Sequence, residues 1–322
     1  MDYEYVDCID AGTQFCPCHL AETDECILCS QLNGKKFCDC KNWKGVCIYQ
    51  ELVQNENKAK KGRETFNGSI LEKIVLDEKI ILLTIKLPHY LVKDLTYVGS
   101  FVFVRNPNAE SFYDAPISIM EADSENDIIK IAIEIRGIKT KNLLDLEDKI
   151  LVRGPYWNGV LGLKNIVNTK DKVCVVIASK IATAPSIPVI KKLKNNGNKI
   201  IYIFENGGLN LSFINDYLIR YTDEIIQMNL FKNGELTDEF RGFLDKINKE
   251  TFLIHCSTVD IIIAKVINYL EDKKHSCCNN AKMCCGEGVC GSCSIRYKNH
   301  RVKRLCKIQI EPKYIFEDRR LI

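Results

Sequence analysis

The pattern of hydrophobic and polar positions changes character along the chain. Residues 1–55 show little apolar periodicity. From residue 66 onward, short runs rich in Ile, Val and Phe are bounded by Gly, Pro, Asn and Asp, as β-strands are. These runs cover residues 66–76, 79–87, 99–105, 116–121, 128–135 and 149–153. Six short strands in about 90 residues predict a small antiparallel β-barrel.

The pattern changes at Lys172, and from there on apolar runs alternate with helix-like stretches. The runs that we expect to be strands are 173–178, 199–204, 223–228 and 251–256, and the helical stretches are 184–196, 212–220, 237–247 and 258–271. Alternation of this kind is typical of a parallel sheet covered by helices on both faces. The sequence therefore predicts an α/β domain after the barrel.

These patterns predict a multidomain protein with small Cys-rich, metal-binding segments at both ends. A charged stretch at residues 55–63 reads as a linker between the first segment and the barrel. The predicted parts are a Cys-rich segment at 1–55, a β-barrel at 64–162, an α/β domain at 163–272 and a second Cys-rich segment at 273–322.

Composition narrows the classes of protein that the chain can represent. It has 322 residues, of which 46% are hydrophobic, enough for two or three domains with real cores. The 45 basic and 42 acidic side chains nearly balance, which argues against a nucleic-acid-binding protein. No apolar run approaches the roughly 18 residues that span a bilayer. The acidic start lacks the apolar region of a secretory signal, so we expect a cytoplasmic protein without a membrane partner.

Seventeen cysteines are the main anomaly of the composition. Eight lie between Cys8 and Cys47, and seven lie between Cys277 and Cys306. In a reducing cytosol such dense groups indicate metal sites rather than disulfides. Cys174 and Cys256 stand apart inside or at the end of apolar runs, and we expect them to be small buried hydrophobic residues.

The C-terminal group has the spacing of a plant-type [2Fe-2S] site, C-x4-C-x2-C followed by a distant fourth cysteine. Three thiolates must converge from one tight loop, and Gly286, Gly288 and Gly291 allow the turns that this needs. Zinc, which favours paired CxxC motifs, is the alternative. The fourth thiolate would arrive after a strand at 294–297 and a turn at 298–300. The predicted cluster ligands are Cys285, Cys290, Cys293 and Cys306, while Cys277, Cys278 and Cys284 are left without a role.

A barrel, an α/β domain and a C-terminal [2Fe-2S] segment form a distinctive order. Residues 283–293 (MCCGEGVCGSC), 116–119 (PISI) and 154–159 (GPYWNG) are similar to three motifs of one family. The chain resembles the electron-transfer subunit of dihydroorotate dehydrogenase and its sulfide dehydrogenase-like relatives, within the ferredoxin–NADP reductase superfamily. The resemblance covers roughly residues 64–310 and implies FAD on a flavin-type barrel and NAD(P)H at the strand ends of the α/β domain.

The resemblance also implies which residues meet the flavin. They lie on the motif strand, on the strand beside it and at the pyrophosphate. In chain order they are Pro116, Ile117 and Ser118, then Ile133 and Ile135, then Lys139 and Thr140. Thr140 also precedes a helical run, so a helix N-terminus could meet phosphate there.

The chain departs from the family at both nucleotide sites. Asp114 and Ala115 stand where the flavin motif has its arginine, and Glu134 replaces another. An acid near a pyrophosphate repels it, so the alternative to FAD binding is a barrel that has lost or weakened it. The loop at 178–185 has no glycine where the family's glycines let phosphates approach the backbone. This loop argues against NAD(P) binding and favours an α/β domain kept as a scaffold or docking surface.

The N-terminal cysteines come in pairs: CPC at 16–18, CxxC at 26–29 and CxC at 38–40. Over about 30 residues this order is similar to the catalytic subunit of ferredoxin–thioredoxin reductase. The resemblance implies a [4Fe-4S] cluster beside a redox-active dithiol. Its ligands would be Cys16, Cys26, Cys29 and Cys38, and its dithiol would be Cys18 and Cys40. One or two structural zinc sites are the alternative, because CxxC and CxC also suit tetrahedral zinc.

Together these features predict an electron-transfer subunit of a flavin and iron–sulfur oxidoreductase. It would pass electrons between FAD, the [2Fe-2S] cluster and a partner, which would be a catalytic flavoprotein or another redox subunit in a hetero-oligomer. Two alternatives stay open at this point. The chain could be a redox adaptor with a dead nucleotide site, or a thiol–disulfide reductase that uses Cys18 and Cys40.

Overall fold

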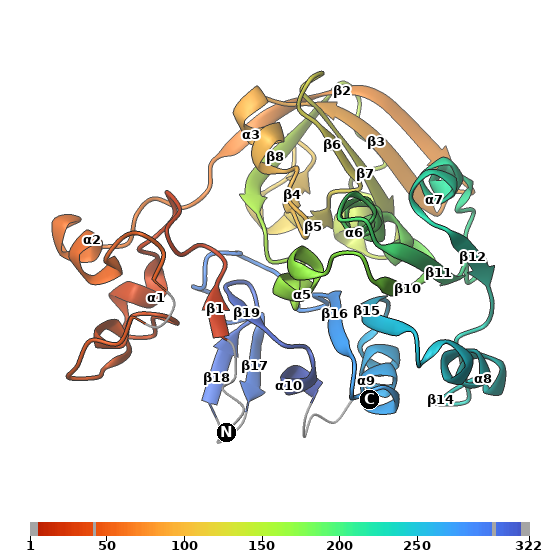
Figure 1. The fold of residues 1–322 in the computed structure, drawn as a ribbon. Helices are drawn as coiled ribbons and strands as arrows, with labels where there is room; N and C mark the ends of the chain where they lie inside the picture. The colour runs from red at the N-terminus through yellow and green to blue at the C-terminus, as the bar shows by residue number, and fades with distance from the viewer. Residues whose placement is uncertain (1–5, 41–42, 298–300, 317–322) are drawn as a thin grey trace.

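The computed structural model describes residues 6–40, 43–297 and 301–316. A curled β-sheet and an α/β layer form the body of the molecule (Figure 1). The two Cys-rich ends of the chain lie together beside this body, drawn in red and blue. The part of the chain that is described contains no helix long and apolar enough to cross a membrane.

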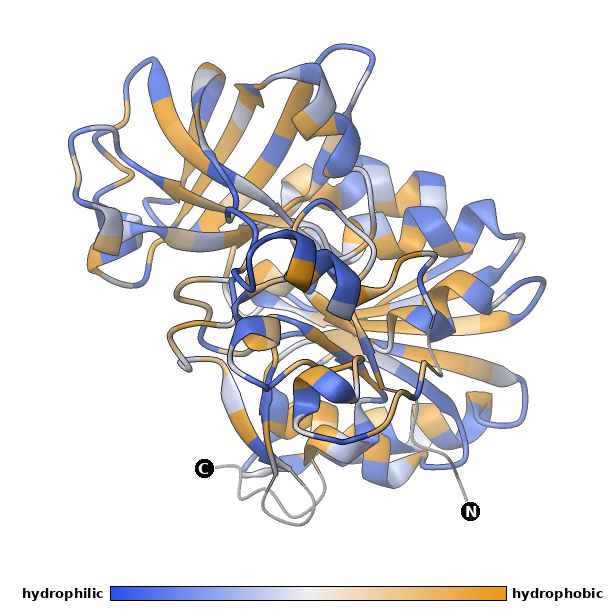
Figure 2. Ribbon diagram, turned by 90° about the vertical axis from the view of Figure 1, so that its left-hand side faces the viewer, coloured by the Kyte–Doolittle hydropathy of each residue, from blue (hydrophilic) through white to orange (hydrophobic). Residues whose placement is uncertain are grey.

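The barrel is a seven-stranded antiparallel sheet that curls into a half-barrel, as predicted. In sheet order its strands are β5 (Ala115–Ser118), β4 (Phe101–Arg105), β8 (Lys149–Tyr156), β2 (Thr65–Leu76), β3 (Ile80–Lys86), β7 (Ile128–Glu134) and β6 (Glu121–Asp123). Hydrophobic residues are frequent along these strands (Figure 2). Ile81, Leu83 and Ile85 of β3 are almost fully buried, because every second side chain of a strand points to the same face and these three share the face that turns to the core. The connections carry α3 (His89–Asp94), η2 (Ser111–Tyr113) and α4 (Ile138–Lys141).

The single strand expected at 116–121 is two strands, because the chain changes partner within it. β5 pairs with β4, whereas β6 pairs with β7 at the other edge of the sheet. Between them Ile119 donates its N–H to the Ser100 carbonyl and Met120 donates to the Lys130 carbonyl, both at 3.0 Å. This short crossing joins the two edges and gives the sheet its curl.

The α/β domain has a six-stranded sheet with helices on both faces, as predicted. In sheet order the strands are β12 (Glu224–Gln227), β11 (Lys199–Glu205), β10 (Val173–Ser179), β15 (Thr251–Ser257), β16 (Lys274–Cys278) and β9 (Val160–Leu161). One face is covered by α5 (Leu163–Asn168), α6 (Thr183–Asn195) and α7 (Asn215–Tyr221), and the other by α8 (Asp238–Ile247) and α9 (Asp260–Tyr269). Short elements between them are η3 (Lys180–Ala182), η4 (Ser212–Ile214), β13 (Phe231–Lys232) and β14 (Glu235–Leu236).

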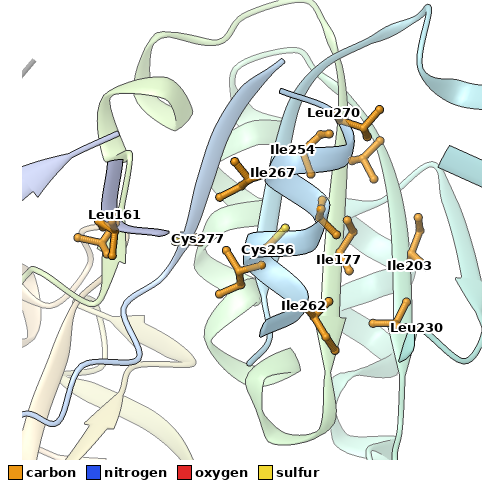
Figure 3. Packing of buried hydrophobic residues seen from close by; sticks show 14 of the residues in the cluster. Leu161, Ile177, Ile203, Leu230, Ile254, Cys256, Ile262, Ile267, Leu270 and Cys277 are labelled. Carbon is orange, nitrogen blue, oxygen red and sulfur yellow. The ribbon is translucent and has the colours of Figure 1, made fainter. Parts of the chain in front are cut away.

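The core of this domain contains the isolated cysteines. Ile262 and Ile267 of α9 pack against Ile254 and Cys256 of the sheet (Figure 3). Cys256 is 1% exposed, and Cys174 is fully buried on the opposite face, which confirms the expectation for both.

The parallel sheet continues beyond residue 272, because β16 adds a further parallel strand to β15. Its Cys277 is fully buried in the same core, so one of the cysteines left over in the sequence is a packing residue. β9 closes the sheet as its antiparallel edge. β9 follows β8 after a short turn, so the chain passes directly from the half-barrel into the sheet of the α/β domain.

The two ends of the chain form one structure. β1 (Val6–Cys8) pairs antiparallel with β19 (Ile308–Ile310), beside the hairpin of β17 (Ser294–Tyr297) and β18 (Arg301–Arg304). The rest of the N-terminal segment holds α1 (His19–Glu22), η1 (Gln31–Asn33) and α2 (Ile48–Gln54), and α10 (Lys313–Phe316) follows β19. The apolar core of the N-terminal segment is small and consists mainly of Ala21, Leu32, Ile48 and Leu52.

A buried network of four charges joins this segment to the C-terminal loop. Arg63 donates to Asp10 at 2.6 Å and to Glu287 at 2.9 Å, and Lys307 donates to the same two carboxylates at 2.5 and 3.1 Å. Glu287 is the most exposed of the four side chains, at 20%. Burial alone would raise the pKa of both carboxyls, but the charges of Lys307 and Arg63 hold each pKa below its usual value. Both acids therefore stay ionised at neutral pH.

Replacing Arg63 with Ala should destabilise the protein strongly, because two buried carboxylates would share one cation. We expect the free energy of unfolding in urea to fall by about 3–5 kcal/mol. The matched control is Lys61→Ala, which removes an ion pair with Glu64 that is largely exposed to solvent. The control should change the free energy by less than about 0.5 kcal/mol. Equal losses in the two variants would contradict the structural role of the network.

Candidate functional site

The loop that holds Cys285 and Cys290 is folded around its sulfur atoms. The backbone N–H groups of Glu287 and Cys290 donate to the Cys285 Sγ at 3.3 and 3.5 Å. The N–H of Ser292 donates to the Cys290 Sγ at 3.5 Å. Backbone donors of this kind stabilise metal-bound thiolates and tune their potential. The loop thus fits an iron–sulfur cluster in its backbone as well as in its spacing.

Gly286 has a separate reason to be glycine. It adopts a left-handed backbone with φ of +74°, and a Cβ atom there would lie 2.4 Å from the Tyr156 ring. Gly288 is similar, with φ of +79° and a Cβ position 3.1 Å from Leu20 of α1. The loop therefore packs tightly against β8 on one side and against the N-terminal segment on the other.

The hairpin of β17 and β18 brings the other two predicted ligands together. Ser294 pairs with Arg304, and the Leu305 N–H donates to the Cys293 carbonyl at 3.1 Å. Cys293 and Cys306 are both 4% exposed, and their thiols are hydrogen-bonded to each other. That bond lowers the pKa of the Cys293 thiol and raises the pKa of the Cys306 thiol, as expected for two thiols close enough to share a proton. The turn expected at 298–300 lies outside the described residues.

The structure brings the four predicted ligands onto neighbouring segments without closing them around a metal. Across the described residues, no three Cys, His, Asp or Glu side chains are already placed to hold one metal ion. Cys285 and Cys290 lie on one loop, and Cys293 and Cys306 lie at the base of the adjoining hairpin. Cluster binding would therefore draw four neighbouring sulfurs together around backbone donors that are already in place.

The cluster loop rests directly on strand β8 of the half-barrel. The carbonyl of Cys285 accepts hydrogen bonds from Arg153 at 3.0 Å and from the Tyr156 hydroxyl at 3.3 Å. The Tyr156 ring stacks on Phe101 at 5.1 Å and meets Phe103 edge-on at 5.2 Å. These aromatic contacts fix the end of β8 and hence the position of the loop.

The same Arg153 supplies charge that the flavin motif lacks. Its guanidinium bonds to Asp114 at 2.9 Å, and Arg105 of β4 bonds to the other oxygen of that carboxylate at 2.8 Å. Lys139 donates to the Asp114 carbonyl, also at 2.8 Å. Asp114 is therefore neutralised rather than free to repel a phosphate. The buried Nε of Arg105 has no hydrogen-bond partner within the described residues.

Sequence reasoning missed both arginines because neither lies inside the flavin motif. Arg153 does precede the GPYWNG turn directly, and this was the available signal. An acid that replaces a motif arginine suggests that cations elsewhere face it, but the sequence does not say where they are.

The other predicted flavin residues differ in how far they are exposed to solvent. On the edge strand β5, Pro116 is exposed, and Ile117 and Ser118 are half-buried. Ile133 is 1% exposed and faces the barrel core, so it can offer a flavin only its backbone. Ile135, just beyond β7, is half-buried and packs partly against the same core.

The expected phosphate site at Thr140 is a single helical turn. α4 has four residues, and the Thr140 hydroxyl accepts hydrogen bonds from the backbone N–H groups of Arg136 and Gly137, at 2.9 and 3.2 Å. The hydroxyl thus caps its own turn.

The glycine-free loop after β10 is closed by its own side chains. Lys180 adopts a left-handed backbone with φ of +52°, the conformation that glycine takes most easily. Its side chain lies over Gly207, where a Cβ atom would approach within 2.7 Å of it. Ser179 and Thr258 are buried and join their hydroxyls at 2.6 Å across the strand ends. In dinucleotide-binding folds the loop after the first strand is where phosphates meet glycine backbone, and here this loop carries the side chains of Ser179 and Lys180 instead.

The eight N-terminal cysteines separate into two groups. The Cys18 sulfur interacts electrostatically with those of Cys8, Cys16 and Cys26. The Cys40 sulfur lies 3.6 Å from that of Cys38 and interacts with those of Cys47 and Cys29. The proposed dithiol partners Cys18 and Cys40 thus fall in different groups. Cys29 also donates its backbone N–H to the Cys26 sulfur at 3.4 Å, which places it between the groups.

Comparisons with known proteins agree with the resemblance noted in the sequence. No protein-family model matches the chain. It is 26% identical over 249 residues to the electron transfer subunit of dihydroorotate dehydrogenase B (NAD(+)) from Clostridium perfringens, covering 76% of this chain and 94% of that relative. It is 26% identical over 206 residues to the probable subunit of the same name from Pyrococcus horikoshii, covering 61% and 73%.

Among solved structures, the NADH-dependent reduced ferredoxin–NADP oxidoreductase, described in the context of flavin-based electron bifurcation, superposes with a TM-score of 0.58. The match covers 78% of this chain and 91% of that one, at 16% identity. The predicted relationship is therefore confirmed: the curated relatives are electron transfer subunits of dihydroorotate dehydrogenase B, and the fold is that of the ferredoxin–NADP reductases.

Substituting Gly286 with Ala should test how tightly the cluster loop is seated. The variant combines left-handed strain of about 1 kcal/mol with a clash against Tyr156 that costs a further 1–3 kcal/mol. Gly208→Ala is the matched control, because Gly208 has φ of +78° and open space around its Cβ position. Urea denaturation should show a larger loss of stability in Gly286→Ala. Equal losses would mean that the contact with Tyr156 is unimportant.

Proposed function

We propose that this chain is the electron-transfer subunit of an oxidoreductase that uses flavin and iron–sulfur. It passes electrons between FAD on the half-barrel, a [2Fe-2S] cluster and a partner protein. The observation that carries the proposal is the position of Arg153, which bonds both the Cys285 carbonyl and the Asp114 carboxylate. The proposed cluster ligands are Cys285, Cys290, Cys293 and Cys306.

This contact supports a short route between two redox centres. Asp114 comes two residues before Pro116 of the flavin motif, and Cys285 is the first proposed cluster ligand. One guanidinium spans both, so a flavin at the motif and a cluster on the loop would be neighbours. A flavin exchanges electrons singly or in pairs, whereas such a cluster carries one at a time, so the pair can connect a two-electron reaction to one-electron transfer.

A partner subunit follows from the nature of the relatives, which are named as electron transfer subunits. No other reaction centre is needed on this chain if the partner carries the substrate site. The cluster loop presents Val289, which is 54% exposed, next to the exposed Cys290. An exposed apolar residue beside a cluster ligand suits a docking point for a redox partner.

A redox adaptor without nucleotide chemistry is the second candidate function. The glycine-free loop, with Lys180 over Gly207 and Ser179 hydrogen-bonded to Thr258, favours it, because side chains stand where a nucleotide-binding loop has glycines. Adding NADH or NADPH to the anaerobic flavin-loaded protein distinguishes a subunit that reacts with nicotinamide nucleotides from a redox adaptor that does not. Bleaching of the flavin band would support a working nucleotide site, and an unchanged spectrum would support the adaptor.

Anaerobic purification should yield a chain with about two irons, two sulfides and one flavin, together with the visible bands of a [2Fe-2S] centre. Cys285→Ser should lose most of the iron and these bands. Cys284→Ser is the matched control, because its neighbouring thiol is exposed and is not a proposed ligand. Zinc in place of iron in the wild type, or equal losses in both variants, would overturn the cluster assignment.

Removing the carboxylate of Asp114 should strengthen flavin binding. In Asp114→Asn, Arg105 and Arg153 would face the flavin phosphates without a competing acid. We expect the Kd for FAD to fall five- to tenfold, or about 1 kcal/mol, in fluorescence titrations. Asp145→Asn, an exposed acid of the same domain, should leave the Kd unchanged. A higher Kd in Asp114→Asn would show instead that Asp114 positions the two arginines for binding.

A further inference from the structure

Four cysteines of the N-terminal segment line one small cavity. They are Cys8, Cys16, Cys18 and Cys26, and the cavity has a volume of about 10 Å³. Most of the remaining wall is apolar, including Leu20, Leu28 and Ile48. Cys26 is buried, and the other three are half-buried.

Separate parts of the segment bring these thiols together. Cys8 ends β1, where it pairs with Ile308 of β19. Cys16 and Cys18 flank Pro17, and the carbonyl of Cys18 accepts the N–H of Ala21 in the first turn of α1. Cys26 follows α1, and its N–H donates to the Leu32 carbonyl at 3.0 Å. The backbone that carries each thiol is therefore fixed by hydrogen bonds within the segment or to β19.

Among the side chains that line the cavity, the cysteine thiols are the groups that can serve as metal ligands. Asp10 also lines the cavity, but both of its oxygens are bound by Arg63 and Lys307. Lys307 interacts electrostatically with Cys8 and Cys18. The two cations nearest the cavity, Arg63 and Lys307, are already paired with Asp10 and Glu287.

We infer that Cys8, Cys16, Cys18 and Cys26 bind one zinc ion as four thiolate ligands. This ligand set differs from the one suggested by the spacing of the cysteines, since it includes Cys8 and Cys18 and leaves out Cys29 and Cys38. The cavity has about the volume of one water-sized sphere, which suits a single ion rather than a four-iron cluster. No three of the described thiols already stand close enough to share one ion, so zinc binding would have to draw these sulfurs inward.

A zinc ion here explains how the segment holds its shape. Its apolar core is small, and short domains with such cores depend on metals or disulfides. A site that includes Cys8 also ties α1 to the strand pair of β1 and β19. The inference does not depend on the [2Fe-2S] cluster or on the flavin.

The test combines metal analysis with site-resolved alkylation of the purified full-length chain. Wild-type protein should contain zinc, and Cys8 and Cys18 should resist N-ethylmaleimide until a zinc chelator is added. In Cys18→Ser, zinc should fall by about one ion per chain, and Cys8, Cys16 and Cys26 should react without chelator. The [2Fe-2S] absorbance should persist in this variant. Loss of zinc can therefore be told apart from loss of the cluster, on which the proposed function depends.

Cys40→Ser is the matched control, because Cys40 belongs to the other group of four. In this variant Cys8 should keep its chelator-dependent protection. The inference is overturned if Cys8 and Cys18 of the zinc-containing wild type react freely, or if Cys40→Ser exposes Cys8 as fully as Cys18→Ser does. Iron and sulfide that disappear in Cys18→Ser, in place of zinc, would overturn the assignment of the ion. The wild-type measurement stands even if a variant fails to fold.

Discussion

Four buried charges hold the functional end of this protein together. Asp10, Arg63, Glu287 and Lys307 come from distant parts of the chain and sum to zero. Removing ions from water is costly, and the cost is recovered only when every member is present with good geometry. The Arg63 guanidinium adds a second type of contact, since it lies 3.9 Å over the Phe15 ring and 4.7 Å over Tyr156. The network therefore works as a junction that forms completely or not at all.

The junction determines where the cluster loop lies. Glu287 sits in the middle of that loop, and it also accepts the backbone N–H of Arg63 at 3.2 Å. On its barrel side the loop is held by Arg153 and Tyr156 through the Cys285 carbonyl. The loop is thus held at Cys285 and at Glu287 by side chains from elsewhere in the sequence. A cluster bound on this loop would keep a fixed position relative to the half-barrel.

Local patterns predicted the strands and helices well, whereas long-range contacts were beyond the sequence. β3 and β7 lie within one residue of their predicted bounds, because an apolar run bounded by turn residues is a local signal. The spacing from Cys285 to Cys293 is informative for the same reason. By contrast, β16 was missed because His275, Cys277 and Cys278 do not make an apolar run. The pairing of Asp10 with Lys307, 297 residues apart, leaves no mark on local sequence.

The pairing of β1 with β19 has a consequence for the synthesis of the protein. The N-terminal segment leaves the ribosome first, yet the strand and the lysine that complete it are made nearly 300 residues later. At typical rates of translation this interval is roughly 15–60 s. During that time eight cysteines are present in an unfinished segment. Until the last strand arrives, these thiols are less enclosed than in the folded protein and more open to oxidation.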